Sequence, residues 1–437
     1  MNSVAAVPMI VRVLVSLAVI LVANRLIRNL AAAVLLGTVA LAVFTGQPAG
    51  ASFRIAAVRL FSSDNGYLML VIFLVIWLSS QMAEAGVMSD LVDAVRGRIG
   101  SRHAMAVLPA LIGFLPMPGG AIFSAPLVEK CDLTGSTEPI VKTRANYWFR
   151  HVWEPWWPLY PGVLLAMHLS GVEVWQFMLL GLPVSAAAIA GGYLFLMRRV
   201  PDTLPEDDSS PAVSATSPVR LLAPVFTVIA GYAVFRIFFA AARHAIPEMP
   251  APNRYLPMIF GILLAVLVQE HLRPLPGQAW RRILLSSKTL NLVLIVAAVR
   301  VYGAFIEAPL PAGTNPVALM QEEMVRWGIP AVAMIMLLPF IAGLTTGLGI
   351  GFVGASFPIV VSMMGVGPRP ATVLAFTGLA FACGHVGQLL SPVHVCLVVT
   401  NEHFKTDLLR SLRGLLAPAG LMVLAALAVY ASILRWM

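Results

Sequence analysis

Two short segments of the chain carry ionisable and amide side chains at matching positions. His151 and Glu154 stand at i, i+3 in the first, and His385 and Gln388 repeat that spacing in the second, 234 residues later. In both, a proline follows four residues further on. Histidine titrates in the physiological range, and a carboxylate within an apolar span is costly and marks a functional site by default. The sequence therefore predicts that Glu154 and His151 couple a transport step to an ion.

Structural roles for Glu154 are also open at this stage. Arg150 or His151 would form an ion pair with it, and the three tryptophans between positions 153 and 157 are typical of an aromatic belt at a membrane surface. His151 with Glu154 also resembles part of a metal motif, although its only matched partner is the pair His385 and Gln388. The likeness is weak, and the sequence predicts no metal and no organic cofactor.

Two apolar stretches, 104–128 and 329–364, are interrupted at their centres by glycine and proline. The first break runs from Leu115 to Gly120 and the second from Gly343 to Gly351. Such residues do not continue a helix, so we interpret both stretches as re-entrant hairpins. Non-helical backbone at membrane depth is tolerated only inside protein or against a water-filled cavity.

We therefore expect the two hairpin tips and the second histidine segment to bind a solute. The expected solute-binding residues are Met117, Pro118, Gly119, Gly120, Ser124, Thr345, Thr346, Gly347, Gly349, Ser356, His385, Gln388 and His394. Two structural alternatives stay open: the glycines would serve close helix packing, and the serine hydroxyls would bond to their own helix backbone.

The elements that must position these residues are membrane-spanning helices. The chain has 437 residues, of which 59% are hydrophobic and 11% charged, whereas soluble domains carry about 25% charged residues. Its apolar runs suit spanning helices, and no short alternating strands of a barrel stand out. The expected fold is all-α, with about ten spans and a retained first span: 5–24, 30–46, 67–85, 147–169, 174–197, 221–242, 255–271, 289–307, 371–400 and 414–434.

The basic residues indicate the orientation of these spans. With both hairpins re-entrant, loops on one face hold 18 Lys and Arg and loops on the other hold 7. The positive-inside rule makes the first face cytoplasmic, which places both termini outside and the polar linker 200–218 inside, in a plasma (inner) membrane. The net charge of +9 is spread through these loops and does not indicate nucleic-acid binding. The partners expected are the lipid bilayer and a small solute.

The chain reads as two related halves, 1–199 and 219–437, of opposite topology. Each is expected to contain three spans, a hairpin, a broken span (147–169 or 371–400) and a final span. Leu-Pro-x-x-x-Gly recurs from 108 and from 338, and Ser-x-Pro recurs from 124 and from 356. Paired broken helices at equivalent positions point to the solute site of secondary transporters.

These segments resemble the ion-transporter superfamily, which includes divalent-anion/sodium symporters and gluconate and dicarboxylate carriers. The segments 108–126, 343–358 and 385–394 are most similar to an uncharacterised integral-membrane family, a domain of unknown function. The resemblance implies alternating access, with a hairpin and an unwound helix of each half at the solute site, and a homodimer by analogy. Sodium-coupled dicarboxylate members carry Ser-Asn-Thr at both tips, which this chain lacks, so only the positions of the tips and breaks carry over.

The function expected is secondary active transport of a small organic anion, such as a carboxylate, coupled to protons or sodium. The alternatives are a membrane-embedded enzyme, or an ion channel or sensor on the same scaffold. HExxH, GxSxG and GxxxxGK[ST] are all absent from the sequence, which disfavours an enzyme and ATP-driven transport. Arg300, inside the span 289–307, would bind the anion, snorkel, or pair with Glu307 or Glu84. Cys131, Cys383 and Cys396 lack metal-ligand spacing and read as packing residues or free thiols.

Overall fold

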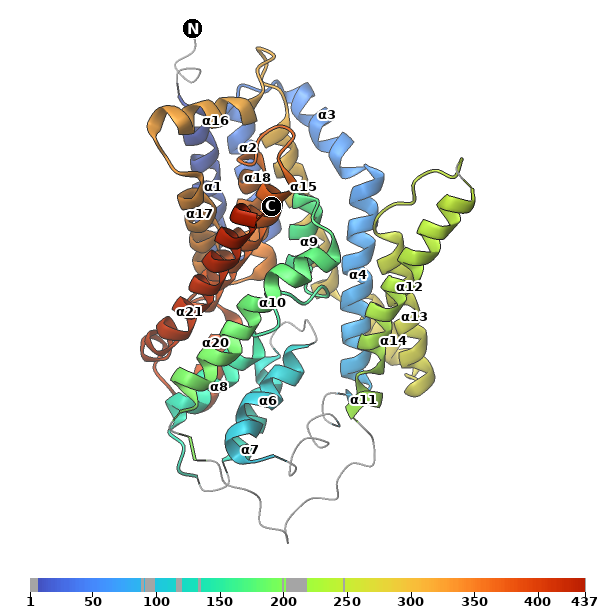
Figure 1. Cartoon of the computed structure of the whole chain (residues 1–437), viewed down its shortest axis with the longest axis vertical. Coiled ribbons are helices and arrows are strands. Elements are labelled where there is room, and N and C mark those ends of the chain that lie inside the picture. Colours follow the sequence, from blue (N-terminus) through green and yellow to red (C-terminus); the bar gives the residue numbers. More distant parts are fainter. Residues whose placement is uncertain are drawn as a thin grey trace.

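The computed structural model describes residues 7–87, 90, 99–114, 120–132, 135–198, 200–201, 218–246 and 248–436. Met117, Pro118 and Gly119 of the first hairpin tip, and positions 202–217 of the linker, lie outside the described residues. Every regular element in the described ranges is helical, which confirms the all-α fold (Figure 1).

Figure 1 shows the helices, coloured in chain order from the N-terminus to the C-terminus. Before the linker they are α1 (Met9–Ile27), α2 (Leu30–Phe44), α3 (Ala49–Leu60), α4 (Ser63–Glu84), α6 (Ser101–Gly113), α7 (Ala121–Cys131), α8 (Pro139–Arg150), α9 (Pro161–Ser170), α10 (Val174–Gly191) and the π-helix η2 (Gly192–Leu196). After it they are α11 (Pro218–Leu221), α12 (Ala223–Ala245), α13 (Leu256–Leu272), α14 (Gly277–Leu284), α15 (Ser287–Glu307), α16 (Pro316–Trp327), α17 (Ala331–Thr346), α18 (Gly349–Ser362), α19 (Pro370–Leu389), α20 (Val395–Phe404) and α21 (Leu408–Trp436).

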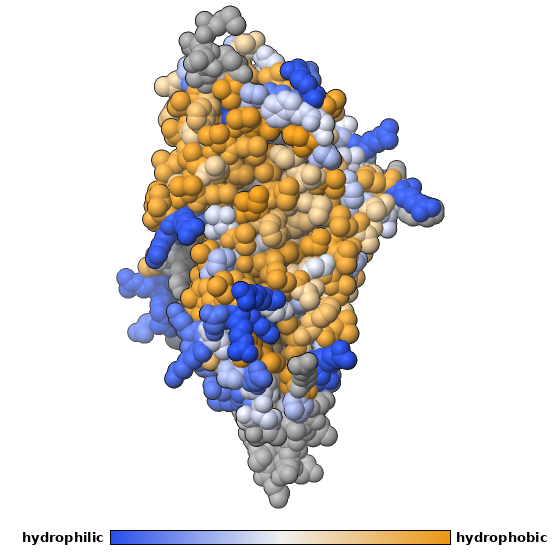
Figure 2. All heavy atoms as spheres, turned by 90° about the vertical axis from the view of Figure 1, so that its left-hand side faces the viewer, coloured by the Kyte–Doolittle hydropathy of each residue, from blue (hydrophilic) through white to orange (hydrophobic). Residues whose placement is uncertain are grey.

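The chain is a multi-pass membrane protein. Seven helical stretches of the described residues are long and apolar enough to cross a bilayer: Met9–Ile27, Ser63–Glu84, Val174–Leu196, Ala223–Ala245, Gly277–Glu307, Pro370–Leu389 and Leu408–Arg435. The predicted spans 30–46 and 255–271 are the shorter apolar helices α2 and α13. Figure 2 shows one broad face that is mostly hydrophobic, with hydrophilic residues gathered towards its lower end, as expected of a surface in contact with lipid.

Both stretches that the sequence interprets as hairpins consist of two helices packed against each other. They are α6 with α7 and α17 with α18. In the second, Gly347 takes φ +64° as the C-cap of α17, and α18 begins at Gly349. This left-handed conformation suits glycine, so the Gly-rich sequence ends one helix and starts the next. The side of the membrane from which each hairpin opens stays a prediction.

The two broken spans are interrupted to different extents. In the first, α8 ends at Arg150 and α9 begins at Pro161, so 151–160 form the break. In the second, α19 runs to Leu389 and α20 begins at Val395. The sequence predicts that Gly384, Gly387 and Pro392 interrupt the second span. Pro392 does lie in the break, but the prediction is wrong for Gly384 and Gly387, because both lie inside α19. Glycine in a helix interior destabilises the helix by only about 1 kcal/mol relative to alanine, so α19 continues through both glycines. The prolines of the first segment, in contrast, exclude a continuous helix.

A hairpin helix of each half packs against the broken span of the other half. The hairpin helix α7 packs against α20, and its counterpart α18 packs against α9. The final helices α10 and α21 also pack together, beside the breaks. Each half therefore covers the broken span of the other, and the two breaks meet inside the molecule.

The same close helix crossing occurs once in each half. A Cβ at Gly113 of α6 would lie 2.1 Å from the carbonyl oxygen of Arg150, and a Cβ at Gly343 of α17 would lie 2.2 Å from that of Gly384. These are matching positions of the Leu-Pro-x-x-x-Gly repeat and of the two histidine segments. Only glycine lets the backbones approach so closely, so both glycines fix their hairpins against the broken spans.

Candidate functional site

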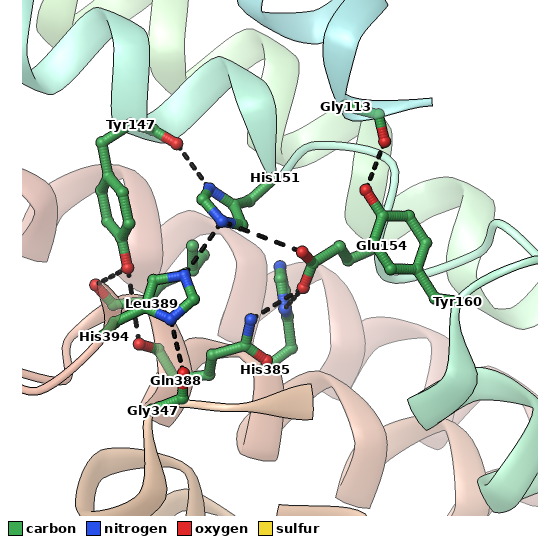
Figure 3. Close-up of polar contacts among 10 residues, drawn as sticks. All are labelled: Gly113, Tyr147, His151, Glu154, Tyr160, Gly347, His385, Gln388, Leu389 and His394. Carbon is green, nitrogen blue, oxygen red and sulfur yellow. Dashed lines mark hydrogen bonds and ion pairs between the residues drawn. The ribbon is translucent and has the colours of Figure 1, made fainter. Parts of the chain in front are cut away.

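The two breaks meet at a hydrogen bond between equivalent residues of the two halves. The Gln388 amide Nε2 donates to Glu154 Oε2 at 2.8 Å, across a separation of 234 residues that equals the offset between the histidine segments. Figure 3 shows Glu154 approaching from the first break and Gln388 from the end of α19. The single carboxylate of this pair thus lies where the two halves join.

Histidines from both halves surround the Glu154 carboxylate. His385 Nδ1 lies 3.4 Å from Oε2, and His151 Nε2 lies 3.8 Å from Oε1. The Glu154 side chain is 13% exposed, and both histidines are buried. Of the ion-pair partners that the sequence suggests, His151 is beside the carboxylate, and the structure adds His385 (Figure 3).

His151 pairs with His394 rather than with its repeat equivalent. The His151 Nδ1 atom is 2.6 Å from the Tyr147 carbonyl oxygen, and His394 Nδ1 bonds to the Gly347 carbonyl oxygen. The two Nε2 atoms then face each other at 2.9 Å. All three histidines named from the sequence, 151, 385 and 394, therefore belong to one cluster, and they come from both halves.

Cys396 joins this cluster, a role that the sequence analysis missed. Ligand atoms of His151, His394 and Cys396 all lie within 4.8 Å of one another, and all three residues are buried. His394 and Cys396 are two positions apart, but His151 lies 243 residues away, so no metal-ligand spacing could reveal the group. Cys396 is a free thiol, one of the two predicted alternatives, but the sequence does not indicate these two neighbours.

Among the described residues, glycines of both predicted tips lie against residues in or near the breaks. A Cβ at Gly349 would lie 3.3 Å from Gln388 Oε1, and one at Gly347 would lie 2.9 Å from the His394 backbone nitrogen. In the first hairpin, a Cβ at Gly120 would overlap the buried Arg150 guanidinium at 2.2 Å. Of the predicted tip glycines that the structure describes, Gly120, Gly347 and Gly349 therefore lie against the breaks.

Hydroxyl groups of the hairpins mainly bond to their own helices. Thr345, Thr346 and Ser356 donate to carbonyl oxygens one turn earlier at 2.6–2.7 Å, and Ser124 makes longer contacts of 3.4 and 3.5 Å. These are the bonds expected of the structural alternative. Each hydroxyl oxygen still has lone pairs to accept a further bond, so solute binding by these residues stays a prediction.

A cavity of about 1100 Å³ reaches the second hairpin tip. Its walls include Thr345 and Thr346 of the tip, Pro392 and Val393 of the second break, and Asn291 of α15. Asn24 and Arg25 from the last turn of α1, and Arg28 at its C-cap, also line it. This volume would hold a small metabolite. Its lining is mostly apolar, with polar groups contributed by the tip threonines, two asparagines and two arginines.

Arg300 is buried in α15, and the two glutamates that the sequence suggested as partners form ion pairs with other arginines. Glu307 instead pairs with Arg59 at 2.5 Å, and Glu84 pairs with Arg282 at 2.8 Å. Of the alternatives for Arg300, an ion pair with either glutamate is therefore not formed, whereas anion binding and snorkelling stay predictions. Both glutamates lie at helix ends, where arginines of the neighbouring helices α3 and α14 reach them.

These features define a multi-pass helical membrane protein whose two broken spans and two hairpins surround a buried polar cluster. The chain belongs to the family described as "Protein of unknown function (DUF401)", whose model matches residues 10–236 and 258–433. This confirms the expected family of unknown function, whereas the relationship to divalent-anion/sodium symporters stays a prediction.

A solved structure with a similar fold is known, whereas the search of curated proteins gives no relative. No curated protein sequence matches the chain. A structure described as "Crystal structure of the Alcanivorax borkumensis YdaH transporter reveals an unusual topology" is similar, with a TM-score of 0.52 and 12% identity over 90% of each chain. At this identity, the likeness shows the fold alone.

Proposed function

We propose that this protein is a secondary active carrier that moves a small organic anion across the membrane by alternating access. The observation that carries the proposal is the meeting of two broken spans and two hairpins around Glu154 and Gln388. Broken helices at equivalent positions of two halves are typical of carrier binding sites. The fold shared with a protein described as a transporter supports the same function.

The charge and geometry around the second hairpin tip favour an anion. Arg25 and Arg28 line the cavity that reaches this tip, and α18 begins there at Gly349. A helix N-terminus carries partial positive charge and free N–H groups, which suit a carboxylate or oxyanion. We place the solute between Thr346, the start of α18 and the second break.

Glu154 is the group that we assign to the coupling cation, a proton or sodium. Sodium would coordinate carbonyl oxygens at the tips and breaks, where several already accept one hydrogen bond and keep a single lone pair. Tyr160 donates to the Gly113 carbonyl, Ser391 to that of Leu344, and His394 to that of Gly347. The Glu154 carboxylate would supply the negative charge that either cation needs. Its hydrogen bond to Gln388 connects the first half of the chain to the second.

The two cavity arginines are expected to act on solute capture. Replacing Arg25 by Gln and Arg28 by Asn should raise KM about three- to tenfold at low salt with little change in kcat, because positive charge at a cleft raises the local concentration of anions. Arg28 takes φ +54° at the end of α1, and Asn tolerates this conformation. KM measured at two salt concentrations checks this, with Arg413→Gln as the control. An unchanged KM would remove the arginines from the capture route.

A thermal-shift screen tests anion binding without assuming a coupling ion. Purified protein in detergent is heated with small carboxylates and oxyanions, each with and without sodium. We expect at least one anion to raise Tm in a saturable way, because a ligand that binds the folded state stabilises it. The shift should shrink in Thr346→Val and persist in Thr227→Val, whose hydroxyl makes the same type of helix bond in α12. Stabilisation by none of the anions would contradict the proposed solute class.

A further inference from the structure

The rings of His151 and His394 are arranged so that a positively charged species, a proton or a metal ion, is required between their Nε2 atoms. Carbonyl oxygens only accept hydrogen bonds, so Nδ1 of both His151 and His394 must carry the proton that bonds to Tyr147 and Gly347. In neutral rings, each Nε2 then presents a lone pair. These two lone pairs face each other at 2.9 Å in a buried position, where their repulsion would be unscreened.

A thiol and a carboxylate converge on the same point. Cys396 offers Sγ within 4.8 Å of a ring nitrogen of each histidine, and Glu154 Oε1 lies 3.8 Å from His151 Nε2. Cys396 lies in the first turn of α20, where the helix dipole favours a thiolate. A proton shared by two histidines would need only one of these groups as its counter-charge, whereas a divalent metal ion uses both.

We propose that His151, His394 and Cys396 form a binding site for a divalent cation of the zinc class, with Glu154 beside its fourth position. Two imidazoles, one thiolate and a carboxylate or water are a ligand set that Zn²⁺ prefers. Tetrahedral zinc with ordinary bond lengths separates two histidine nitrogens by about 3.3 Å, so the rings need to part by only a few tenths of an ångström.

The surroundings of the site have the features of a built metal centre. In metal-binding histidines, the second ring N–H usually donates a hydrogen bond to a carbonyl or carboxylate, which fixes the tautomer and the ring orientation. Here the Nδ1–H groups of both histidines donate to the carbonyl oxygens of Tyr147 and Gly347. Zinc binding displaces the Cys396 thiol proton to solvent. The charges of the cation, one thiolate and one carboxylate then sum to zero, which suits a site buried in a membrane protein.

The site would tie the two breaks together. His151 belongs to the first break and His394 to the second, and Cys396 follows in the first turn of α20. Zinc binding should therefore raise the thermal stability of the folded chain by mass action. This inference does not depend on the solute or on transport, because it concerns binding to the resting protein.

Metal titration of the full-length protein in detergent tests the inference. After chelator treatment, Zn²⁺ is titrated in competition with a fluorescent chelator, and Co²⁺ serves as a spectroscopic probe. We expect one equivalent per chain, a Tm that rises until that equivalent is reached, and a thiolate-to-cobalt charge-transfer band. His394→Gln should weaken binding by more than about tenfold, and Cys396→Ser should remove the band.

Cys383→Ser is the matched control, because Cys383 is equally buried but lies outside the cluster. This variant should still bind one equivalent of zinc per chain and still show the thiolate-to-cobalt charge-transfer band. Absence of zinc binding to the wild-type protein would overturn the inference, whether or not any variant folds, and would leave only a shared proton. A band that survives Cys396→Ser, or weak binding of several equivalents that no variant alters, would assign the metal to surface groups and would also overturn it.

Discussion

Replacing Glu154 by Gln should abolish accumulation of the solute against its gradient while leaving solute exchange measurable. The variant keeps the size of the side chain and its ability to bond to Gln388, but it removes the carboxylate at the junction of the two halves. A carrier without its coupling charge would still bind and exchange solute, because binding of the solute rests on the hairpin tip. We expect gradient-driven uptake to fall by at least about 100-fold, as for loss of an essential charge.

Two further variants make this result specific. Glu129→Gln removes an exposed carboxylate that pairs with His403 at the molecule's surface, and it should leave uptake unchanged. The exchange variant Glu154→Gln/Gln388→Glu places the carboxylate at the equivalent position of the other half and preserves the hydrogen bond. It should recover part of the accumulation that the single variant loses. Unchanged gradient-driven uptake in Glu154→Gln would remove this residue from the mechanism.

Gly343→Ala should strongly destabilise the protein. The added Cβ would lie 2.2 Å from the Gly384 carbonyl oxygen and 2.7 Å from the Gln388 backbone nitrogen, so α17 must move away from α19. Overpacking of this type costs about 1–3 kcal/mol or more, and here the displaced helix carries the hairpin tip. The expected result is a lower Tm and a smaller monodisperse fraction in detergent.

Gly303→Ala provides the comparison for this loss of stability. A Cβ there would lie 3.6 Å from Pro358, which is ordinary contact, and the exchange of Gly for Ala inside α15 should leave Tm unchanged or slightly higher. If Gly343→Ala were as stable as Gly303→Ala, the close crossing of α17 and α19 would not hold the hairpin in place.

Local sequence features were sufficient to predict the hairpins and the breaks. Proline and clustered glycine act on the backbone through their own sterics, so the interruptions near Gly347 and Pro158 were visible without any tertiary information. The extent of the second break was not, because α19 tolerates Gly384 and Gly387 where it packs closely on α17. The short helices α3, α14 and α16 were assigned to loops because their polar residues lower the average hydropathy.

The partners within the site depend on contacts between the halves. The sequence repeat places Glu154 and Gln388 at equivalent positions, but their direct hydrogen bond follows only from the packing of one broken span on the other. Repeat equivalence also suggested His151 with His385, whereas the nearest ring to His151 belongs to His394. Cys396 carried no signal at all, since its neighbours are brought to it by the fold rather than by spacing.

Uptake by purified protein reconstituted in liposomes tests the carrier function most directly. Radiolabelled anions selected by thermal shift are added outside the vesicles, with an imposed proton or sodium gradient. The proposal predicts saturable accumulation above the external concentration that collapses when the gradient is dissipated and is absent from protein-free vesicles. Equal concentrations inside and outside under both gradients, or uptake that does not saturate, would contradict secondary active transport.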